Sequence, residues 1–536
     1  MRTSALMKNV WFQNGLLFAG CLFIALATNG DKLLSLTIKT IIHVAFQTML
    51  IFGLLCLLNT QRFIKWGLAV FLGVIFFVHF AYQAPLSMGV IFSVLSAPLN
   101  ESTSFLVRHG WELAVTILVV LAVGTRVSIP KSVIWKPSLL LGAGYLIIPF
   151  ALQLPKAYSN DEFADYINKG TARGYSNAYS SVEYTFHKLS LRFPAFQSVI
   201  AIADTYHLMN IQSDQTMTWS EIERKPNAPD LLVIGIGESL RAGNMSLYGY
   251  ERETTPYLDK MRDKLTVFRY PYAAGSNTWG SVPAMLTKTE GIPNMSQSVI
   301  LLANAADYET YWLSNHAQFG QWDFSISTLA QQTDHQYFSS QADGGTMHDE
   351  ILVDQLAKVL AEPSKKKVIF LHFYGSHMNF SDRYPKAFET FRSNNRRLDE
   401  YDNSVVYSDY LQAQVLELVE EAGGQYAFFS DHGLGSPNGP LALRHDVRTP
   451  PDIESLYVPF FFTGDVERDY PSDQPFSMFY FECFFSDWAG IKASELSEQY
   501  CSESLNQDSV IYLDANMALD SHAKSALQKK VLVTQY

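Results

Sequence analysis

The sequence predicts a bundle of five transmembrane helices followed by an α/β domain with a mostly parallel central sheet flanked by helices. Its mean hydropathy of +0.01 is high for a chain with 17% charged residues, and the apolar residues are concentrated in residues 1–155. From residue 229 onward, short apolar runs alternate with helix-like stretches, as in parallel sheets. We expect a transmembrane domain at 1–155, a connector along the membrane surface at 156–228 and a globular domain at 229–536.

Five apolar segments make up the first part, each near the ~17–25 residues that span a bilayer as a helix. They are 10–28, 34–58, 64–82, 111–129 and 138–154. Buried core helices are the alternative, and "ALATNG" near residue 27 also resembles a signal-peptide cleavage site. Lys and Arg gather on one side of these segments, at Arg2, Lys8, Arg62, Lys65, Arg126, Lys131 and Lys136. This bias places the N-terminus inside and residues 155–536 outside the cell membrane.

Three further features concern binding and compartment. The net charge of −12 argues against nucleic acid, which needs clustered Lys and Arg. The interrupted apolar loop at 83–110 is either packed on the bundle or a wall of a lipid-substrate pocket with Asn100 and Glu101 as polar contacts. Cys483 and Cys501 pair if this part is exported; otherwise they are two free thiols.

The chemistry of the second part lies at the ends of predicted strands. The apolar runs are 230–236, 309–313, 367–373, 426–430 and 458–463, with helix-like stretches at 351–361 and 408–421. Three of the runs end in polar side chains, at Glu238, at His377 and at the adjacent Asp431 and His432. Because ligands bind at the carboxyl ends of parallel strands, these carboxylates and imidazoles predict a site for Zn²⁺ or another divalent transition metal.

A nucleophile is expected in "AAGSNTWGSVPAML", residues 273–286, a glycine-containing turn that enters a predicted helix. A hydroxyl at a helix N-terminus is favoured as an anion, and a metal would lower its pKa further. Spacing leaves Ser276, Thr278 and Ser281 as candidates, and helix capping is the alternative for each. Thr255 before Pro256 is predicted to be a helix cap without a catalytic role.

Several stretches together resemble the bacterial phosphoethanolamine transferases of the alkaline phosphatase/sulfatase superfamily. In chain order they are "GESLRAGNMSLYGYERETTPYLDKM", "SNTWGSVPAML", "LHFYGSHMNFSDRYP", "EYDNSVVYSDY" and "FFSDHG". The resemblance implies an alkaline-phosphatase-like domain in the periplasm, attached to a multi-pass inner-membrane bundle. It also implies transfer of phosphoethanolamine from phosphatidylethanolamine, through a threonine-bound intermediate, to a periplasmic glycan or lipopolysaccharide acceptor. Membrane lipids are its other partners, and a monomer is expected.

The same resemblance assigns roles to individual residues. Glu238, Asp431 and His432 match zinc ligands, and Thr278 matches both the nucleophile and the fourth ligand. His377 and His445 match histidines on the phosphate side, with a second metal ion left open. Both are expected to bind substrate and to transfer protons. A hydrogen-bonded structural histidine is the alternative for each.

The chain departs from the lipid A enzymes of this family, which usually have several disulfides. Ala284 stands where a cysteine commonly follows "SVP", and the second part holds only Cys483 and Cys501. This favours the subgroup that modifies lipopolysaccharide core sugars or osmoregulated periplasmic glucans. Two alternatives remain: a phosphoglycerol transferase or membrane-bound phosphatase of the same superfamily, and a non-catalytic envelope protein that binds lipid or glycan.

Overall fold

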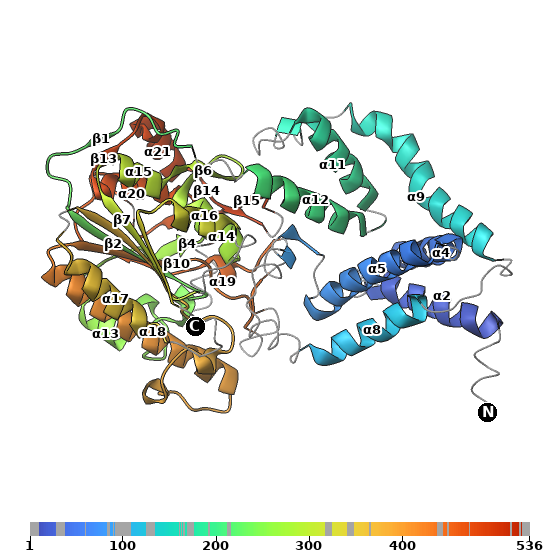
Figure 1. Ribbon diagram of the computed structural model, residues 1–536, viewed down its shortest axis with the longest axis horizontal. Helices are drawn as coiled ribbons and strands as arrows, with labels where there is room; N and C mark the ends of the chain where they lie inside the picture. The colour runs from blue at the N-terminus through green and yellow to red at the C-terminus, as the bar shows by residue number, and fades with distance from the viewer. Residues whose placement is uncertain are drawn as a thin grey trace. The chain divides into compact units, whose positions relative to one another are not determined.

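The chain divides into two compact units, Met1–Tyr206 and His207–Tyr536, in the computed structural model (Figure 1). The residues that the structure describes are 10–27, 38–58, 61–82, 86–88, 90–91, 109–124, 134–159, 161, 163–164, 167–168, 176–190, 193, 195–211, 216–316, 324–339, 348–363, 366–436, 443–446, 450–470, 472–514, 517–524 and 527. The helices of the predicted connector up to residue 206 group with the first unit, and the three-part division of the chain stays a prediction.

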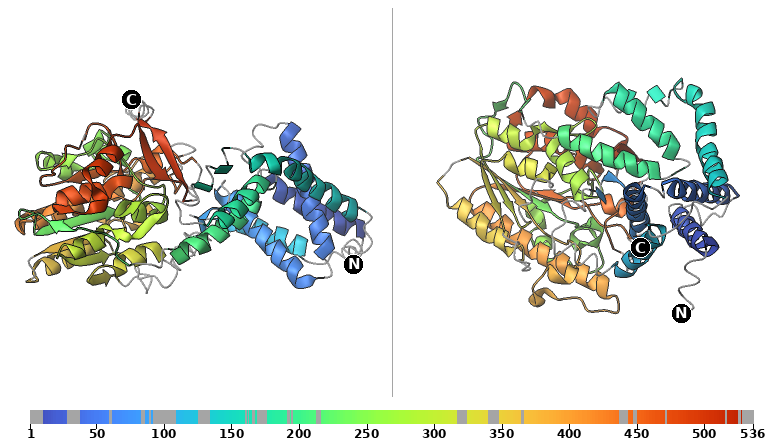
Figure 2. Two further views of the ribbon diagram at one scale, coloured as in Figure 1. Left: turned by 90° about the horizontal axis from the view of Figure 1, so that it is seen from above. Right: turned by 45° about the vertical axis from the view of Figure 1, so that its right-hand side comes forward.

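The described part of the first unit consists of helices: five lie where the apolar segments predict them, and two fall within the predicted connector at 156–228. The helices are α2 (Val10–Ala27), α4 (Ile38–Leu57), α5 (Arg62–Tyr82), α8 (Gly110–Gly124), α9 (Trp135–Ala157), α11 (Asn177–Ser190) and α12 (Ala195–Ile211). The first four pack side by side, as both views in Figure 2 show. Helix α9 packs closely on α4, because Gly53 and Gly142 have no side chain at the contact. The space is filled by the neighbouring helix: a Cβ on Gly142 would lie 2.6 Å from the Leu50 nitrogen.

Three of these helices are long and apolar enough to cross a membrane, judged by length and composition. They are Thr40–Leu57, Phe63–Phe80 and Trp135–Leu152, while Leu17–Leu26 and Gly110–Ala122 are shorter apolar helices. Large apolar side chains on the bundle point outward; Leu118 is 66% exposed and Leu140 is 73% exposed. Helices in the core of a soluble domain would bury such side chains, so these exposures favour a lipid-facing bundle over buried core helices.

A seven-stranded sheet in the order β3-β11-β10-β2-β9-β7-β8 forms the centre of the second unit. Strands β10, β2, β9, β7 and β8 run parallel, and β11 is antiparallel to both of its neighbours. The sheet is therefore mixed: the five consecutive strands from β10 to β8 run parallel, and β11 runs in the opposite direction, where the prediction was of a mostly parallel sheet. The strands are β1 (Glu223–Arg224), β2 (Leu231–Gly237), β3 (Thr266–Val267), β4 (Tyr270–Tyr272), β5 (Thr287–Thr289), β6 (Pro293–Ser298), β7 (Glu309–Ser314), β8 (His335–Phe338), β9 (Lys367–His372), β10 (Gln425–Ser430), β11 (Phe460–Phe462), β12 (Pro475–Ser477), β13 (Ile491–Lys492), β14 (Ser509–Leu513) and β15 (Leu519–Ala523).

Helices cover both faces of this sheet, which explains why its strands are apolar runs rather than alternating sequences. Val233, Ile369 and Phe428 on one face share a core with side chains of α17 and α18, which Figure 1 shows below the sheet. On the other face, Phe429 and Phe460 contact Phe481 of α20. The helices of this unit are α13 (Pro256–Lys260), α14 (Thr278–Leu286), α15 (Val299–Ala305), α16 (Phe324–Gln331), α17 (Glu350–Leu360), α18 (Arg396–Glu421), α19 (Ile453–Leu456), α20 (Phe481–Ala489) and α21 (Glu498–Leu505).

Two local predictions about helix ends need correction. Helix α18 begins at Arg396, twelve residues before the predicted start at 408. Its first turns escape prediction because buried polar side chains such as Asp402 interrupt the apolar period. Partners in other elements satisfy these side chains, as Asn244 does for Asp402. Thr255 stands at the predicted N-cap position of α13, before Pro256, but its hydroxyl makes no capping hydrogen bond and accepts from the Leu247 N–H at 2.7 Å instead. Asp409 caps α13 instead, since it accepts the N–H groups of Tyr257 and Leu258.

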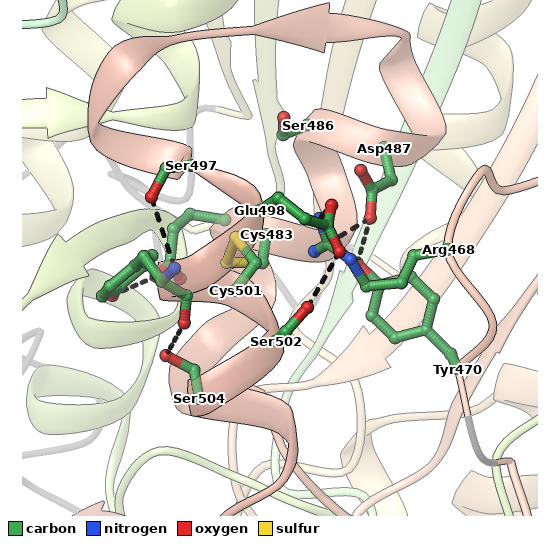
Figure 3. The surroundings of a disulfide bond; sticks show 12 residues. Arg468, Tyr470, Cys483, Ser486, Asp487, Ser497, Glu498, Cys501, Ser502 and Ser504 are labelled. Atoms are coloured by element: carbon green, nitrogen blue, oxygen red, sulfur yellow. Dashed lines mark hydrogen bonds and ion pairs between the residues drawn. A yellow bond between two sulfur atoms is a disulfide. The ribbon is translucent and has the colours of Figure 1, made fainter.

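Cys483 of α20 and Cys501 of α21 form a disulfide, which confirms that the two thiols pair. Figure 3 shows the bond and, beside it, Arg468 between Asp487 and Glu498. The bridge fastens α21 to α20, and α20 in turn packs on the sheet.

Candidate active site

Glu238 is the first residue after β2, and the turn that holds it is fixed from two sides. The next residue, Ser239, has a φ of +59°, a conformation that costs a non-glycine residue free energy and is frequent at functional sites. Tyr401 of α18 stabilises this turn, because its hydroxyl donates to the Ser239 carbonyl at 2.8 Å and accepts from the Arg241 N–H at 2.9 Å. Glu238 is 1% exposed, so its carboxylate is held in a rigid, dry position.

Asp431 and His432 follow β10, the strand that pairs with β2 in parallel register. Both are fully buried. One carboxylate oxygen of Asp431, Oδ1, accepts from the N–H groups of Ser239 at 2.9 Å and His432 at 2.6 Å. The other, Oδ2, is buried and has no hydrogen-bond donor among the described residues.

The His432 ring is oriented by its own backbone. Nδ1–H donates to the Gly433 carbonyl at 2.6 Å, which leaves Nε2 as the basic nitrogen. Nε2 lies 3.3 Å from Asp431 Oδ2 and 3.5 Å from Glu238 Oε1. Two carboxylate oxygens and a basic nitrogen thus converge on one point.

Thr278 brings a hydroxyl to the same point. It is the first residue of α14, whose N-cap is Asn277 accepting from the Gly280 N–H at 2.9 Å. Its Oγ1 lies 3.1 Å from Glu238 Oε2 and 3.3 Å from His432 Nε2. The structure thereby separates the three candidate hydroxyls: Ser276 donates to the Asp446 carbonyl, and the Ser281 hydroxyl is buried without a partner in the described part of the chain.

His377 and His445 form a second group next to the first. His377 follows β9, the neighbour of β2 on the other side, and its ring centre lies 5.2 Å from that of His445. The His445 ring is 5.1 Å from the His432 ring, and its Nε2 is 3.4 Å from the Ser239 hydroxyl. Sequence reasoning placed His377 by its strand and His445 only by resemblance, and the structure brings both beside Glu238.

The electrostatics of the site call for a cation. Burial and the nearby Asp431 raise the pKa of Glu238 well above its usual range. Burial likewise lowers the pKa of His377 to about 3, with Arg383 as the next cause, and burial, His432 and His377 lower that of His445. Two adjacent buried carboxylates cannot both ionise without a compensating charge.

The donor atoms fit a metal ion. Ligand atoms of Glu238, Asp431 and His432 lie within 4.8 Å of one another, as do those of Glu238, His377 and His445. The orphaned Asp431 Oδ2 is the sharpest sign of such an ion, because buried carboxylate oxygens normally have a partner. Carboxylate and imidazole ligands in this number suit zinc.

Sequence reasoning missed the residues that hold the site in place. Tyr401 clamps the turn after β2, and Asp349 accepts from the N–H groups of Tyr374 at 2.9 Å and Gly375 at 2.8 Å after β9. Neither follows a predicted strand, so no local signal marks them. The predicted lipid contacts Asn100 and Glu101 lie outside the described residues.

Comparison with known proteins agrees with this fold. Residues 230–491 match the family model described as Sulfatase. The phosphoethanolamine transferase OpgE of Escherichia coli is 30% identical over 55% of this chain and 57% of its own length. The chain spans about three fifths of the length of the first curated relatives that it matches.

Two solved structures share the fold. The integral membrane lipooligosaccharide phosphoethanolamine transferase A of Neisseria meningitidis covers 91% of this chain and 97% of its own, with a TM-score of 0.67 and 16% identity. The C-terminal periplasmic domain of EcEptC from Escherichia coli, crystallised in complex with Zn, covers 57% of this chain and 96% of its own, with a TM-score of 0.51 and 24% identity.

The fold and the site define an alkaline-phosphatase-like α/β domain, with carboxylate, imidazole and hydroxyl groups at the carboxyl edge of its sheet. Residues 230–491 form a sulfatase-type domain, and the chain is similar to phosphoethanolamine transferases.

Proposed function

We propose that this protein is a zinc-dependent phosphoethanolamine transferase of the bacterial inner membrane. It takes the head group from phosphatidylethanolamine, holds it on Thr278 and passes it to a periplasmic glycan or lipopolysaccharide acceptor. The observation that carries the proposal is the position of Thr278 Oγ1, 3.1 Å from Glu238 Oε2 and 3.3 Å from His432 Nε2. The same nitrogen lies 3.3 Å from Asp431 Oδ2, the oxygen without a donor among the described residues. Relatives that bear the name phosphoethanolamine transferase support the choice of head group.

Glu238, Asp431, His432 and Thr278 would hold the zinc ion. When bound, zinc would withdraw charge from the phosphoryl oxygens and lower the pKa of the threonine hydroxyl. The first turn of α14 adds backbone N–H groups beside the hydroxyl, and these favour the negative charge that develops there.

The first step forms a bond between Thr278 Oγ1 and the donor phosphorus and breaks the bond from phosphorus to the diacylglycerol oxygen. The proton that the threonine hydroxyl gives up is balanced by the proton that the leaving diacylglycerol oxygen takes up. In the second step the acceptor hydroxyl attacks the phosphorus, the bond to Oγ1 breaks, and Oγ1 regains a proton in exchange for the one that the acceptor hydroxyl loses. The lowered pKa values of His377 and His445 keep both rings neutral at pH 7. A neutral imidazole accepts a proton, so these histidines suit the activation of the acceptor hydroxyl.

The membrane part of the proposal comprises five spanning helices, a periplasmic catalytic unit and a monomeric chain. The five apolar helices α2, α4, α5, α8 and α9 and the Lys/Arg bias of their flanks support it. The disulfide between Cys483 and Cys501 suits an oxidising compartment such as the periplasm.

The test is a mass measurement of the full chain in detergent micelles, after incubation with zinc and isotope-labelled phosphatidylethanolamine. Wild type should gain the mass of phosphoethanolamine, and Thr278→Ala should gain nothing. Ser281→Ala removes a neighbouring hydroxyl of the same helix and should keep the adduct.

An adduct that persists in Thr278→Ala would contradict the assignment of the nucleophile. A parallel incubation with labelled phosphatidylglycerol distinguishes a phosphoglycerol transferase, which would take only that head group. Less than one zinc per chain together with no adduct from either lipid would support the non-catalytic alternative.

A further inference from the structure

Arg383 is a cation beside the active site for which the described part of the chain offers no acidic partner. It follows the short 3₁₀ turn η6 (Phe380–Asp382) in the segment after β9, within the quoted motif "LHFYGSHMNFSDRYP". None of its side-chain nitrogens lies within ion-pair distance of a described carboxylate, and its Nε is buried without an acceptor.

The position of the Arg383 side chain is nevertheless defined. Its guanidinium carbon lies 4.3 Å from the centre of the Tyr374 ring, a distance at which arginine stacks favourably on an aromatic face. The residue as a whole is half-buried. Tyr374 is itself anchored, because its N–H donates to Asp349 at 2.9 Å. A stacked guanidinium is pre-organised, so that little side-chain entropy remains to be lost when a ligand binds.

Arg383 lies on the histidine side of the site. The Tyr374 ring centre is 5.2 Å from that of His377, which is in turn 5.2 Å from that of His445. The Arg383 guanidinium is therefore linked to the histidine pair through the single ring of Tyr374.

A partly buried guanidinium nitrogen without an acceptor is costly unless a ligand supplies one. Arginine pairs best with planar or multi-oxygen anions such as phosphate and carboxylate, because its N–H groups form a fork. The Arg383 Nε–H, which has no acceptor among the described residues, therefore indicates an anionic group of a bound substrate.

We propose that Arg383 binds a phosphate or carboxylate group of the acceptor and so selects an anionic glycan over a neutral one. This inference rests on the proposed function. Phosphatidylethanolamine has a single anionic group, the phosphate that must reach Thr278, and its ammonium group would be repelled by Arg383. The anion at Arg383 then belongs to the second substrate. Among the acceptors considered, a phosphate-bearing lipopolysaccharide core fits this residue and an unsubstituted glucan does not.

The experiment measures binding and the first half-reaction separately on the zinc-loaded full chain in detergent micelles. Binding is measured by calorimetry with two probes, a phosphorylated lipopolysaccharide core oligosaccharide and the same oligosaccharide after chemical removal of its phosphates. The first half-reaction is the rate of adduct formation from phosphatidylethanolamine without oligosaccharide. The variants are Arg383→Gln and Arg383→Lys, and the control is Arg392→Gln, an exposed arginine of the same segment paired with Glu389.

Wild type should bind the phosphorylated probe more tightly than the dephosphorylated one. Arg383→Gln should weaken binding of the phosphorylated probe roughly tenfold, as expected for loss of a charge-assisted hydrogen bond, and leave the dephosphorylated probe unaffected. Arg383→Lys should recover part of the affinity, because it keeps the charge without the fork. Adduct formation should be the same in all variants, and Arg392→Gln should match wild type throughout.

Three results would overturn the inference: unchanged binding in Arg383→Gln, no preference of the wild type for the phosphorylated probe, or slowed adduct formation in Arg383→Gln. The last would assign the anion to the donor. A wild type that forms no adduct would refute the proposed function, while the comparison of the two probes would still decide whether Arg383 binds a glycan anion.

Discussion

Thr278 Oγ1 lies 3.1 Å from Glu238 Oε2 although 40 positions of sequence separate the two residues. Neither residue could reach the other without a specific arrangement of β2 and α14. Glu238 is fixed by the turn after β2, and Thr278 is fixed by the Asn277 cap of α14. The contact places a hydroxyl, a carboxylate and, 3.3 Å away, the His432 ring around one point.

Removal of one charged ligand should release the metal. In Asp431→Asn the oxygen that is orphaned in the described structure loses its negative charge. Loss of a residue that only hydrogen-bonds to a metal ligand lowers metal affinity about 10–100-fold. Loss of a ligand itself should lower zinc affinity by more than that. Zinc per chain, measured by atomic mass spectrometry after dialysis against a weak chelator, should drop well below that of wild type. The exposed variant Asp473→Asn should keep its metal, and full retention in Asp431→Asn would rule out Asp431 as a ligand.

Gly375 should be irreplaceable because it supports Glu238 directly. Its φ is +54°, and a Cβ there would lie 2.7 Å from the Glu238 carbonyl oxygen and 2.8 Å from its nitrogen. Gly375→Ala therefore combines about 1–2 kcal/mol of left-handed strain with a displacement of Glu238, and both thermal stability and zinc content should fall. Gly423 has a φ of +73° with nothing within 4 Å of the same position. Gly423→Ala should thus lose stability from strain alone and keep its zinc. Equal zinc content in the two variants would refute the role of Gly375.

Glu482 of α20 should make folding stability depend on pH. Burial raises the pKa of this carboxyl to about 8, above the ordinary value that it regains on unfolding. The folded chain then holds a proton that the unfolded chain releases. This contribution to stability is present below about pH 4.5 and is lost as pH rises through 8, at no more than about 1.4 kcal/mol per pH unit.

The measurement for Glu482 is the free energy of unfolding by denaturant from pH 5 to pH 9. Glu482→Gln keeps an acceptor for the Tyr500 hydroxyl, which lies 2.9 Å from the carboxylate, and cannot ionise. The variant should lack this part of the pH dependence and be more stable than wild type at pH 9. Glu503→Gln, an exposed change on α21, should follow the wild-type curve. Parallel curves for Glu482→Gln and wild type would show that the carboxyl titrates normally.

The disulfide should stabilise the catalytic unit without taking part in the chemistry. Cys483 and Cys501 are 18 positions apart, and closing a loop of that size in the unfolded chain is worth about 3 kcal/mol. The double variant Cys483→Ala with Cys501→Ala should unfold at a lower temperature than wild type. At room temperature, where both proteins are folded, it should form the Thr278 adduct at the wild-type rate. Dithiothreitol should lower the unfolding temperature of wild type and leave the double variant unchanged. An unfolding temperature of wild type that reductant does not alter would contradict this account.

Much of the site was predictable because strand ends in a parallel sheet carry positional information. Runs of apolar residues predicted β2, β9 and β10 nearly to their ends, and the polar residues that follow them are Glu238, His377 and Asp431 with His432. Neighbouring parallel strands align their carboxyl ends, so these residues had to meet. Helix α18 shows the opposite case: its first turns carry buried polar residues whose partners lie in other elements, so no local period marked them.

The sequence by itself determined the apolar helices, the α/β character of the second unit and the types of ligand at its sheet edge, because burial and strand pairing act on patterns a few residues long. Tertiary structure alone decided which of three hydroxyls faces Glu238, that β11 is reversed, that Tyr401 clamps the Ser239 turn and that Arg383 stacks on Tyr374 without an acidic partner among the described residues. These depend on distances between residues far apart in the chain. Such distances are set by sheet register and by the packing of helices and loops on the sheet, which no local propensity encodes.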